Sequence, residues 1–387
     1  MPTTLKVLHV ASGDLWAGAE VQLCQLACAL QRRSDIHLHV ALLNHGLLEA
    51  RLREASVPVT VLEERRLGLL RLATALRSLT ARLTPGVVHS HRYKENLLAA
   101  LALPRSLSGR ARAIAVRTVH GAPEPAASWR VHTARLADTL SARLQHGAIC
   151  VSPELLADVH RRFPTLAIEV IENGFAFDEL DRAVAAANHT PLPGAGLHIG
   201  LVGRLVPVKR PDIFLATAEY LTKAQPDTFS FHVFGEGPLR RQCMHDAQRR
   251  GLAHHLHFHG FRPDMPAILA QLDALVLCSD HEGLPMVLLE AMGLRVPVIA
   301  HAVGGIPHVL ANGRYGYLVH DHSPHGYAQA LQARAQARTS AAMRAAQACA
   351  HVRAHYAIDS VAERYVKFYR HLSGARFHAQ VTDEMRT

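Results

Sequence analysis

Two cations lie five residues apart in a glycine-containing segment of the second half of the chain. The segment is Gly203-Arg-Leu-Val-Pro-Val-Lys-Arg210, and it follows the β-rich residues 197–202. Gly203 permits a tight turn, Arg204 offers a planar guanidinium that binds phosphate through two hydrogen bonds, and Lys209 is a point charge. Amides at the start of the following helix also favour an anion. This spacing predicts a diphosphate site, and the alternative is a solvated cluster of surface charges.

Two glutamates, eight residues apart, follow the strand-like residues 274–277. Glu282 lies in the expected turn, and Glu290 lies two turns into an apolar helix. A carboxylate on an apolar helix face is costly unless it is paired. We therefore expect Glu290 to accept hydrogen bonds, and the vicinal hydroxyls of a ribose would suit its two oxygens. Gly304 and Gly305 follow residues 296–300, where the amides that open a short helix are available to a phosphate.

The first half of the chain holds weaker candidates. Gly13 and Gly18 lie between residues 5–11 and a helix, where glycine lets a ligand approach the backbone. This pattern is also common in turns that bind nothing. His120 and Gly121 follow residues 112–118. Most single histidines are structural, but one at the carboxyl end of a strand is a candidate site residue.

Short β-rich runs alternate with amphipathic helical stretches along both halves, a pattern typical of parallel α/β sheets. The predicted strands are residues 5–11, 37–43, 59–62, 87–90, 112–118, 148–151 and 168–171, then 197–202, 229–234, 256–259, 274–277, 296–300 and 317–319. Helices are expected between them, for example over 19–32 and 93–103, and residues 325–372 are helical throughout. Ligands of such sheets bind at the carboxyl ends of the strands. We therefore predict two Rossmann-like domains whose parallel sheets face an interdomain cleft.

The domain boundary is expected where two prolines and two glycines interrupt the pattern. This predicts an N-terminal domain over residues 1–187, a linker over 188–196 and a second domain over 197–355. Residues 356–387 form a C-terminal helix and tail, expected to pack back toward the N-terminal domain.

Composition limits the class of protein. The chain has 387 residues, of which 49% are hydrophobic and 19% charged, which excludes a disordered or coiled-coil chain and favours two domains. The net charge of +10 suggests an anionic partner: nucleic acid, an acidic membrane or a phosphorylated small molecule. Residues 1–187 contain 22 Lys and Arg and 17 Asp and Glu, which leaves 20 and 15 for the remainder, so each part carries +5. This even distribution argues against a nucleic-acid-binding arm.

The six cysteines show no C-x-x-C spacing, and reduced thiols in a cytoplasmic protein are the simplest interpretation. No leader and no apolar run long enough to span a bilayer is expected. The segment from Arg51 to Arg82 contains seven arginines interleaved with leucines. Such a basic amphipathic helix suits an anionic membrane surface, and the alternative is an ordinary helix with its leucines in the core. His255, His257 and His259 alternate along one strand, but in a chain with 28 histidines they do not predict a metal site.

Taken in order, these motifs resemble the glycosyltransferase group 1 family, retaining transferases of GT-B fold that use nucleotide sugars. The resemblance covers nearly the whole chain. It is carried by Ala17-Gly-Ala-Glu20, Thr118-Val-His120-Gly121, Gly203-Arg204 with Lys209, Gly235-Glu-Gly237-Pro238, and Glu282 with Glu290. Two positions depart from the family pattern. Ala17 replaces a glycine, and Asn173-Gly174-Phe175-Ala176 lacks the usual final aspartate.

The resemblance implies roles for individual residues. Arg204 and Lys209 would bind the diphosphate, Glu282 the hydroxyls of the donor sugar, Glu290 the ribose, and His120 the sugar and its phosphate. The catalytic residues implied are His120, Arg204, Lys209 and Glu282. The donor-binding residues implied are Gly18, Gly203, Gly260, Phe261, Gly283, Leu284, Pro285, Met286, Glu290, Gly304 and Gly305. Gly260 and Phe261 would lie near the base.

The function expected is that of a retaining glycosyltransferase acting on a glycan or lipid-linked acceptor. Its product would be a cell-surface polysaccharide, lipopolysaccharide or glycolipid. The resemblance favours a UDP-sugar, while the sugar, the acceptor and the oligomeric state are not specified. No cofactor or metal is expected, because the two cations replace a metal and no D-x-D is present. The location expected is cytoplasmic, with peripheral contact at the inner face of the plasma membrane. The alternatives are a nucleotide-sugar 2-epimerase on the same fold and a nucleotide-binding protein without catalysis.

Overall fold

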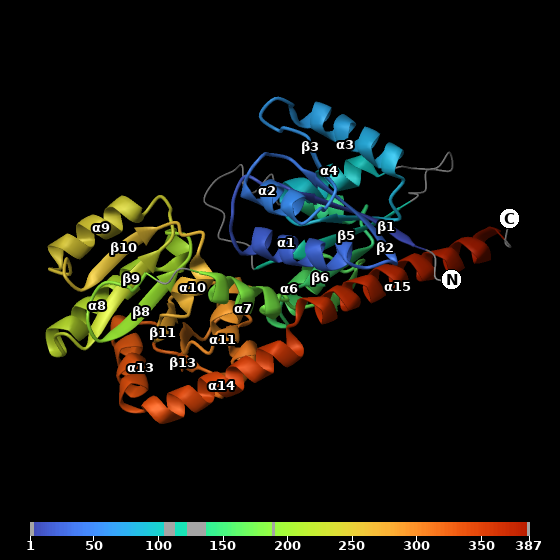
Figure 1. The fold of residues 1–387 in the computed structure, drawn as a ribbon. Coiled ribbons are helices and arrows are strands. Elements are labelled where there is room, and N and C mark those ends of the chain that lie inside the picture. Colours follow the sequence, from blue (N-terminus) through green and yellow to red (C-terminus); the bar gives the residue numbers. More distant parts are fainter. Residues whose placement is uncertain (1–3, 104–112, 122–136, 188–189, 385–387) are drawn as a thin grey trace. The chain divides into compact units, whose positions relative to one another are not determined.

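The computed structural model describes residues 4–103, 113–121, 137–187 and 190–384, with side chains described as far as residue 374. The chain divides into two compact units. Unit 1 contains the chain up to Gly174 and again from Ile358, and unit 2 contains Phe175–Ala357. Each unit is a parallel α/β domain (Figure 1).

Unit 1 is built on a seven-stranded parallel sheet of order β3-β2-β1-β4-β5-β6-β7. Its strands are β1 (Leu5–Ala11), β2 (Ile36–Leu42), β3 (Val59–Val61), β4 (Val87–Ser90), β5 (Ile114–Val119), β6 (Gly147–Cys150) and β7 (Ala167–Val170). Its helices include α1 (Gly18–Gln31), α2 (Leu47–Glu54), α3 (Leu69–Leu83), α4 (Tyr93–Ala102), α6 (Glu154–Arg162) and α15 (Ile358–Glu384).

Unit 2 is built on a six-stranded parallel sheet of order β10-β9-β8-β11-β12-β13. Its strands are β8 (Leu197–Val202), β9 (Phe229–Phe234), β10 (Leu256–Gly260), β11 (Ala274–Leu277), β12 (Val298–His301) and β13 (Tyr317–Val319). Its α-helices are α7 (Phe177–Ala186), α8 (Pro211–Ala224), α9 (Arg240–Arg249), α10 (Met265–Leu269), α11 (Met286–Gly293), α12 (Ile306–Val309), α13 (Pro324–Gln336) and α14 (Arg338–His355). A 3-10 turn, η1, spans Pro207–Lys209.

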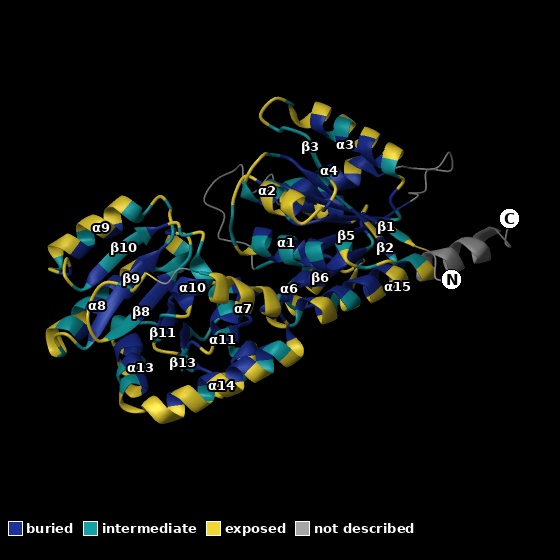
Figure 2. Ribbon diagram, in the orientation of Figure 1, coloured by how far each residue is buried: buried dark blue, intermediate teal, exposed yellow. Residues whose placement is uncertain are grey.

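The predicted α/β class is confirmed, and the strand ends lie within two residues of those predicted. Residue 112, at the start of one predicted strand, lies outside the described residues. The strands are apolar runs because helices cover both faces of a parallel sheet. Figure 2 shows the result: the strands are largely buried, and the exposed residues follow the outer sides of the helices.

The units divide at a different place from the proline- and glycine-rich residues 188–196. Helix α7 belongs to unit 2, because Phe177 and Leu180 are buried on it and lie against Gly293 in α11. Helix α15 belongs to unit 1, where Phe368 and Leu372 lie against Gly147 of β6. Of the predicted linker, residues 188–189 lie outside the described residues.

The segment from Arg51 to Arg82 is not one helix. Helix α2 ends at Glu54, strand β3 follows, and α3 begins only at Leu69. Within α3, the leucines Leu72, Leu76 and Leu79 are buried in the core of unit 1, while the arginines of the whole segment are exposed. Among the described helices, none combines the length and the apolar character needed to cross a bilayer.

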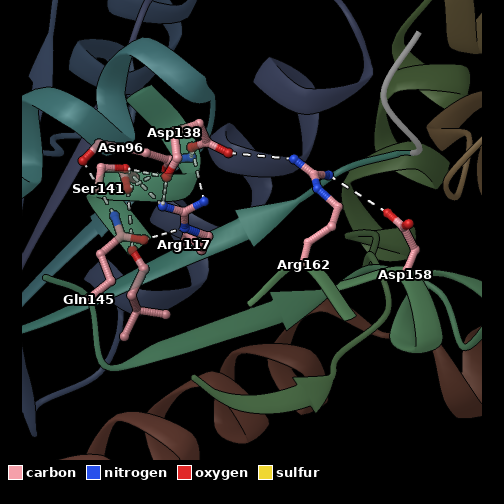
Figure 3. Close-up of polar contacts among 9 residues, drawn as sticks. Asn96, Arg117, Asp138, Ser141, Gln145, Asp158 and Arg162 are labelled. Carbon is pink, nitrogen blue, oxygen red and sulfur yellow. Dashed lines mark hydrogen bonds and ion pairs between the residues drawn. The ribbon is translucent and has the colours of Figure 1, made fainter. Parts of the chain in front are cut away.

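A buried ion pair fixes the end of β5 in unit 1 (Figure 3). Arg117 and Asp138 are each 1% exposed, and Arg117 Nη1 donates to Asp138 Oδ1 at 2.9 Å. Asn96 Nδ2 donates to the same oxygen at 2.9 Å, and Arg117 also donates to Ser141 and Gln145. A buried charge is tolerated only when its partners satisfy it. This network therefore holds the strand that leads to His120.

Candidate functional site

The turns at the carboxyl ends of the unit 2 strands contact one another. Gly203 N, after β8, donates to Phe234 O at 3.0 Å, and Gly235 N donates to Gly260 O at 2.7 Å. Asp280 N, after β11, donates to Val208 O at 2.8 Å, and Gly305 N, after β12, donates to Gly283 O at 2.8 Å. The structure therefore places the motifs predicted in this half along one edge of the sheet.

Two of these turns leave no room for a side chain. Gly235 has φ +134°, and a Cβ built on it would lie 2.0 Å from the Gly203 carbonyl oxygen. Gly304 has φ +57°, and its Cβ would lie 1.9 Å from the Glu282 carbonyl oxygen. Both glycines are needed to bring neighbouring turns this close.

The structure brings Lys209 and Glu282 together. Lys209, the last residue of η1, donates from Nζ to Glu282 Oε1 at 2.5 Å. Ser279 Oγ donates to the same oxygen at 2.6 Å, and the Glu282 side chain is only 9% exposed. The carboxylate is therefore held by two donors at the end of β11.

Arg204 and Arg210 differ in what they contact. Arg204 is exposed, and its guanidinium makes no hydrogen bond or ion pair with any residue that the structure describes. Arg210 pairs with Asp212 and, at 3.1 Å, with Asp280, and the hydrogen bonds that it donates to Asp212 raise its pKa above the ordinary value. Arg210 is thus committed to the protein, while Arg204 is available to an anion.

Glu290 lies on α11 between buried Leu289 and Ala291. Its side chain is partly buried, and its carboxyl makes no hydrogen bond or ion pair within the described part of the chain. Burial raises the pKa of this carboxyl to about 7. The hydrogen-bonding partners expected for Glu290 are therefore not supplied by these residues.

The remaining predicted residues of unit 2 line the same edge. Gly283, Leu284, Pro285 and Met286 are buried and lead from the Glu282 turn into α11. Gly260 closes β10 with φ +68°, and Phe261 after it is an exposed aromatic, 50% accessible. An exposed phenyl ring is suited to stacking on a flat group.

In unit 1, the turn after β1 contacts the start of α4. Ser12 Oγ donates to Glu95 Oε1 at 2.7 Å, and Arg92 Nη2 donates to Glu20 Oε1. These four residues and His91 line a small pocket beside α1, the helix that Gly18 opens. Burial raises the pKa of Glu20 despite the nearby charge of Arg92. Ala17 is extended, with φ −139°, so its methyl group causes no backbone strain in this turn.

His120 follows β5 and is partly buried. Its Nε2 lies 3.3 Å from His91 Nδ1. Burial, and secondarily the charge of Arg92, lowers the pKa of His120 to about 4, so the imidazole is neutral at pH 7. Sequence reasoning missed His91 and Arg92, although both follow the predicted strand 87–90 and the same carboxyl-end criterion selects them.

The alternating histidines at 255, 257 and 259, of which the last two lie on β10, do not form a ligand group in the described part of the chain. His259 Nε2 lies 3.1 Å from His232 Nδ1 on the neighbouring strand β9. Among the described residues, the side chains whose potential metal-ligand atoms lie close together are instead His9, His89 and His91 in unit 1, with one nitrogen of each within 4.8 Å of the others.

Comparison with known proteins identifies the class. Residues 196–336 match the family model "Glycosyl transferases group 1", and residues 16–179 match "Glycosyltransferase Family 4". The solved structure of Anabaena Alr3699/HepE in complex with UDP-glucose superposes with a TM-score of 0.78 at 21% identity, covering 94% of this chain and 99% of that one. The fold is therefore that of the GT-B glycosyltransferases.

Two curated relatives match part of the chain. The D-inositol 3-phosphate glycosyltransferase of Corynebacterium glutamicum is 32% identical over 148 residues, which are 36% of this chain and 35% of the relative. The putative colanic acid biosynthesis glycosyltransferase WcaL of Salmonella typhimurium is 33% identical over 150 residues, 37% and 36% of the two chains. The chain thus aligns with about a third of the length of these relatives. With both domain models matched, it belongs to the group 1 glycosyltransferase family.

Proposed function

We propose that this protein transfers a glycosyl group from a UDP-sugar to a hydroxyl of a glycan or lipid-linked acceptor, with retention of anomeric configuration. The observation that carries the proposal is the Lys209–Glu282 pair, held at 2.5 Å on a glycine-framed sheet edge beside Arg204, which pairs with none of the residues that the structure describes. HepE, similar in fold, has been solved with UDP-glucose, which supports a UDP-sugar donor. The name of WcaL supports a polysaccharide product.

Charge explains how these residues would act. When the bond between the anomeric carbon and the β-phosphate oxygen breaks, the electron pair stays on the phosphate, and the sugar gains cationic character. Arg204 and Lys209 would stabilise the negative charge on the leaving diphosphate. The acceptor oxygen bonds to the anomeric carbon from the same face, and its proton passes to the leaving phosphate oxygen. Glu282, already held by two donors, would bind sugar hydroxyls rather than attack the sugar.

The other predicted residues are assigned by the same proposal. Glu290 would accept from the two ribose hydroxyls, Phe261 and Gly260 would lie near the base, and His120 would contact the sugar and its phosphate. The turn from Gly283 to Met286 and the amide of Gly304 would donate to the sugar and phosphate, while Gly305 holds this turn through its own bond to Gly283 O. Two positive side chains supply the charge that a divalent ion supplies in other transferases, so we propose that transfer needs no metal.

The direct test is a thermal-shift screen of nucleotide sugars, followed by a transfer assay with the donor that binds. A ligand that binds only the folded state raises the melting temperature with concentration. We expect UDP and one UDP-sugar to do so, transfer to continue in EDTA, and the anomeric configuration of the product to match the donor. Absence of any stabilisation by nucleotide sugars, or an inverted product, would contradict the proposal.

We also propose contact with an anionic membrane through the start of α3. Leu69 and Leu70 are 48% and 82% exposed, and exposed Arg65, Arg66 and Arg71 flank them. Apolar side chains surrounded by arginines suit the headgroup region of an acidic bilayer. Flotation with phosphatidylglycerol vesicles tests this, and replacing both leucines with serine should reduce the bound fraction. Met343→Ser, an exposed apolar residue of unit 2, is the matched control.

A further inference from the structure

Six side chains in unit 1 form one continuous hydrogen-bonded chain that ends at His120. Its members are Thr118, His89, Tyr369, His9, His91 and His120. The successive distances are 2.7 Å from Thr118 Oγ1 to His89 Nε2, 2.5 Å from His89 Nδ1 to the Tyr369 hydroxyl, and 3.5 Å from that hydroxyl to His9 Nε2. His9 Nδ1 then lies 2.9 Å from His91 Nε2, and His91 Nδ1 lies 3.3 Å from His120 Nε2.

Sheet order and register produce this chain. His9 on β1 and His89 on β4 are paired residues of adjacent strands, and His91 follows β4. His120 follows β5, the next strand in the sheet, and Tyr369 reaches the chain from α15. The rings of His9 and His91 are tilted by only 20°, and those of His91 and His120 by 29°. Their ring centroids are 5.2 and 5.6 Å apart, in each pair about two ring radii more than the N–N distance, so the nitrogens meet edge to edge, as a hydrogen bond between two imidazoles requires.

Counting protons shows that these bonds are coupled. Burial lowers the pKa of His9 to about 3, and it lowers the pKa of His89 and His91 well below the ordinary value. Each neutral ring has one N–H and one lone pair. If one ring nitrogen donates, the other must accept, so the ring to which Tyr369 donates its single proton fixes the direction of every other bond.

The bond between Tyr369 and His89 sets that direction. A phenol is a better donor than acceptor toward a neutral imidazole, and at 2.5 Å this bond is the shortest of the chain. Tyr369 therefore donates to His89 Nδ1, and its oxygen accepts from His9 Nε2. His9 then accepts from His91 Nε2, and His91 accepts from His120 Nε2. In this arrangement all four histidines carry the proton on Nε2, and Nδ1 of His120 is left as a lone pair.

We infer that the chain from His89 to His91 is a positioning relay, which holds His120 in one orientation and in the tautomer with the proton on Nε2. His91 is the residue that acts directly on His120, and Tyr369 fixes the direction. The effect of the relay on transfer rests on the proposed function, because it assumes that His120 contacts the sugar. The tautomer of His120 does not depend on that assumption.

A metal ion at His9, His89 and His91 is the competing interpretation, because one nitrogen from each lies within 4.8 Å of the others. Zinc at about 2.0 Å from each ligand would hold the nitrogens roughly 3.3 Å apart. His9 Nδ1 and His91 Nε2 are already closer, at 2.9 Å, as a hydrogen-bonded pair. The rings of His89 and His91 are also nearly parallel, at 10°, so their in-plane lone pairs do not converge on one point.

The test uses variants of His91 that keep one of its two bonds. An asparagine amide reaches the place of Nδ1 and can still bond to His120, while a glutamine amide reaches the place of Nε2 and bonds only to His9. Nitrogen-15 NMR of the histidine-labelled full chain reports the tautomer of each ring, with His120 assigned from a His120→Gln spectrum. We expect His120 to carry its proton on Nε2 in the wild type and in His91→Asn, and to become a tautomer mixture in His91→Gln.

Kinetics and two further variants separate positioning from folding. His91→Gln should lower kcat about tenfold or more with little change in donor KM, and His91→Asn should recover most of the loss. Tyr369→Phe keeps the ring but removes the direction-setting proton, so it should also mix the His120 tautomers. Ser90 lies on β4 beside His89, and Ser90→Ala removes a buried hydrogen bond to Asn96 of α4, so this variant should leave the His120 tautomer unchanged.

Three results would overturn the relay. They are a proton on Nδ1 of His120 in the wild type, an unchanged His120 tautomer in His91→Gln, and stoichiometric binding of Zn²⁺ that shifts the signals of His9, His89 and His91. Failure of the wild type to transfer from any nucleotide sugar would contradict the proposed function alone, because the NMR measurement still decides on the relay.

Discussion

Replacing Glu290 with glutamine should stabilise the free protein and weaken donor binding at the same time. The carboxyl is partly buried between apolar neighbours, and burial raises its pKa from 4.5 to about 7. At about 1.4 kcal/mol per pKa unit, ionising it in the folded state costs up to about 3 kcal/mol. This is an upper value, because the side chain keeps some contact with solvent.

The pH dependence gives the prediction its sign. The folded pKa lies above the unfolded one, so the folded state binds this proton more tightly. The penalty is fully present above about pH 7, declines as the pH falls through the folded pKa, and is absent below about pH 4.5. Glu290→Gln should therefore be more stable than the wild type by about 3 kcal/mol at pH 8 and by less than about 1 kcal/mol at pH 5.

Calorimetry of the full chain at these two pH values measures the effect. For a domain the size of unit 2, about 3 kcal/mol corresponds to a rise of roughly 6–12 °C in Tm. If Glu290 binds ribose, the glutamine loses charge-assisted hydrogen bonds, and the Kd for UDP should rise about tenfold or more. Glu282→Gln is the matched control. Its carboxylate is already paired with Lys209, so that variant should lose stability.

Two outcomes would refute this reasoning separately. A stability gain that is equal at pH 8 and pH 5 would show that the buried charge is not its cause. An unchanged Kd for UDP would remove Glu290 from the donor site while leaving the stability argument intact.

The other predictions concern the cations, the buried pair and the buried histidines. Arg204→Ala and Lys209→Ala should each abolish transfer while the circular dichroism spectrum stays that of the wild type; turnover near the wild-type rate in either variant would contradict the diphosphate assignment. Asp138→Asn should destabilise unit 1 by about 3–5 kcal/mol in urea unfolding, because Arg117 keeps its buried charge without its partner. The control is Asp158→Asn, at a partly exposed ion pair with Arg162, which should change the free energy of unfolding by less than about 1 kcal/mol. His9 and His120 have folded pKa values of about 3 and 4, below the unfolded value of 6.5, so their contribution is complete above pH 6.5 and is lost as the pH falls toward those values. His9→Asn should therefore flatten the pH dependence of Tm between pH 6 and 4, and an unaltered slope would show that His9 is protonated in the folded state.

Local sequence pattern predicts the strands well, because each is an apolar run that helices bury on both faces. It also predicts which side chains share the unit 2 edge, because the carboxyl ends of parallel strands lie together whatever the strand order. Lys209 and Glu282 meet for this reason, 73 positions apart in the sequence. The same criterion, applied to β4, also selects His91 and Arg92, which directly follow that strand.

The histidine chain depends on information that pattern does not contain. His9 and His89 lie side by side because β1 and β4 are adjacent and paired in register, although two strands separate them in sequence. Nor does composition locate the boundary between units. Prolines and glycines at 190–196 mark irregular backbone, whereas unit 1 ends at Gly174. Beyond it, α7 belongs to unit 2 because Phe177 and Leu180 pack against Gly293 of α11.

The two cations of the proposed diphosphate site are not equivalent, although both follow β8. Lys209 is neutralised by Glu282 at 2.5 Å, so a diphosphate must compete with a carboxylate for it. Arg204 has no such competitor among the described residues and is exposed, so it can meet the anion first. Once the phosphate takes over Lys209, the released Glu282 oxygen becomes an acceptor for a sugar hydroxyl. Binding of the diphosphate and recognition of the sugar are therefore coupled through one ion pair, and UDP alone should break that pair without using the carboxylate it frees.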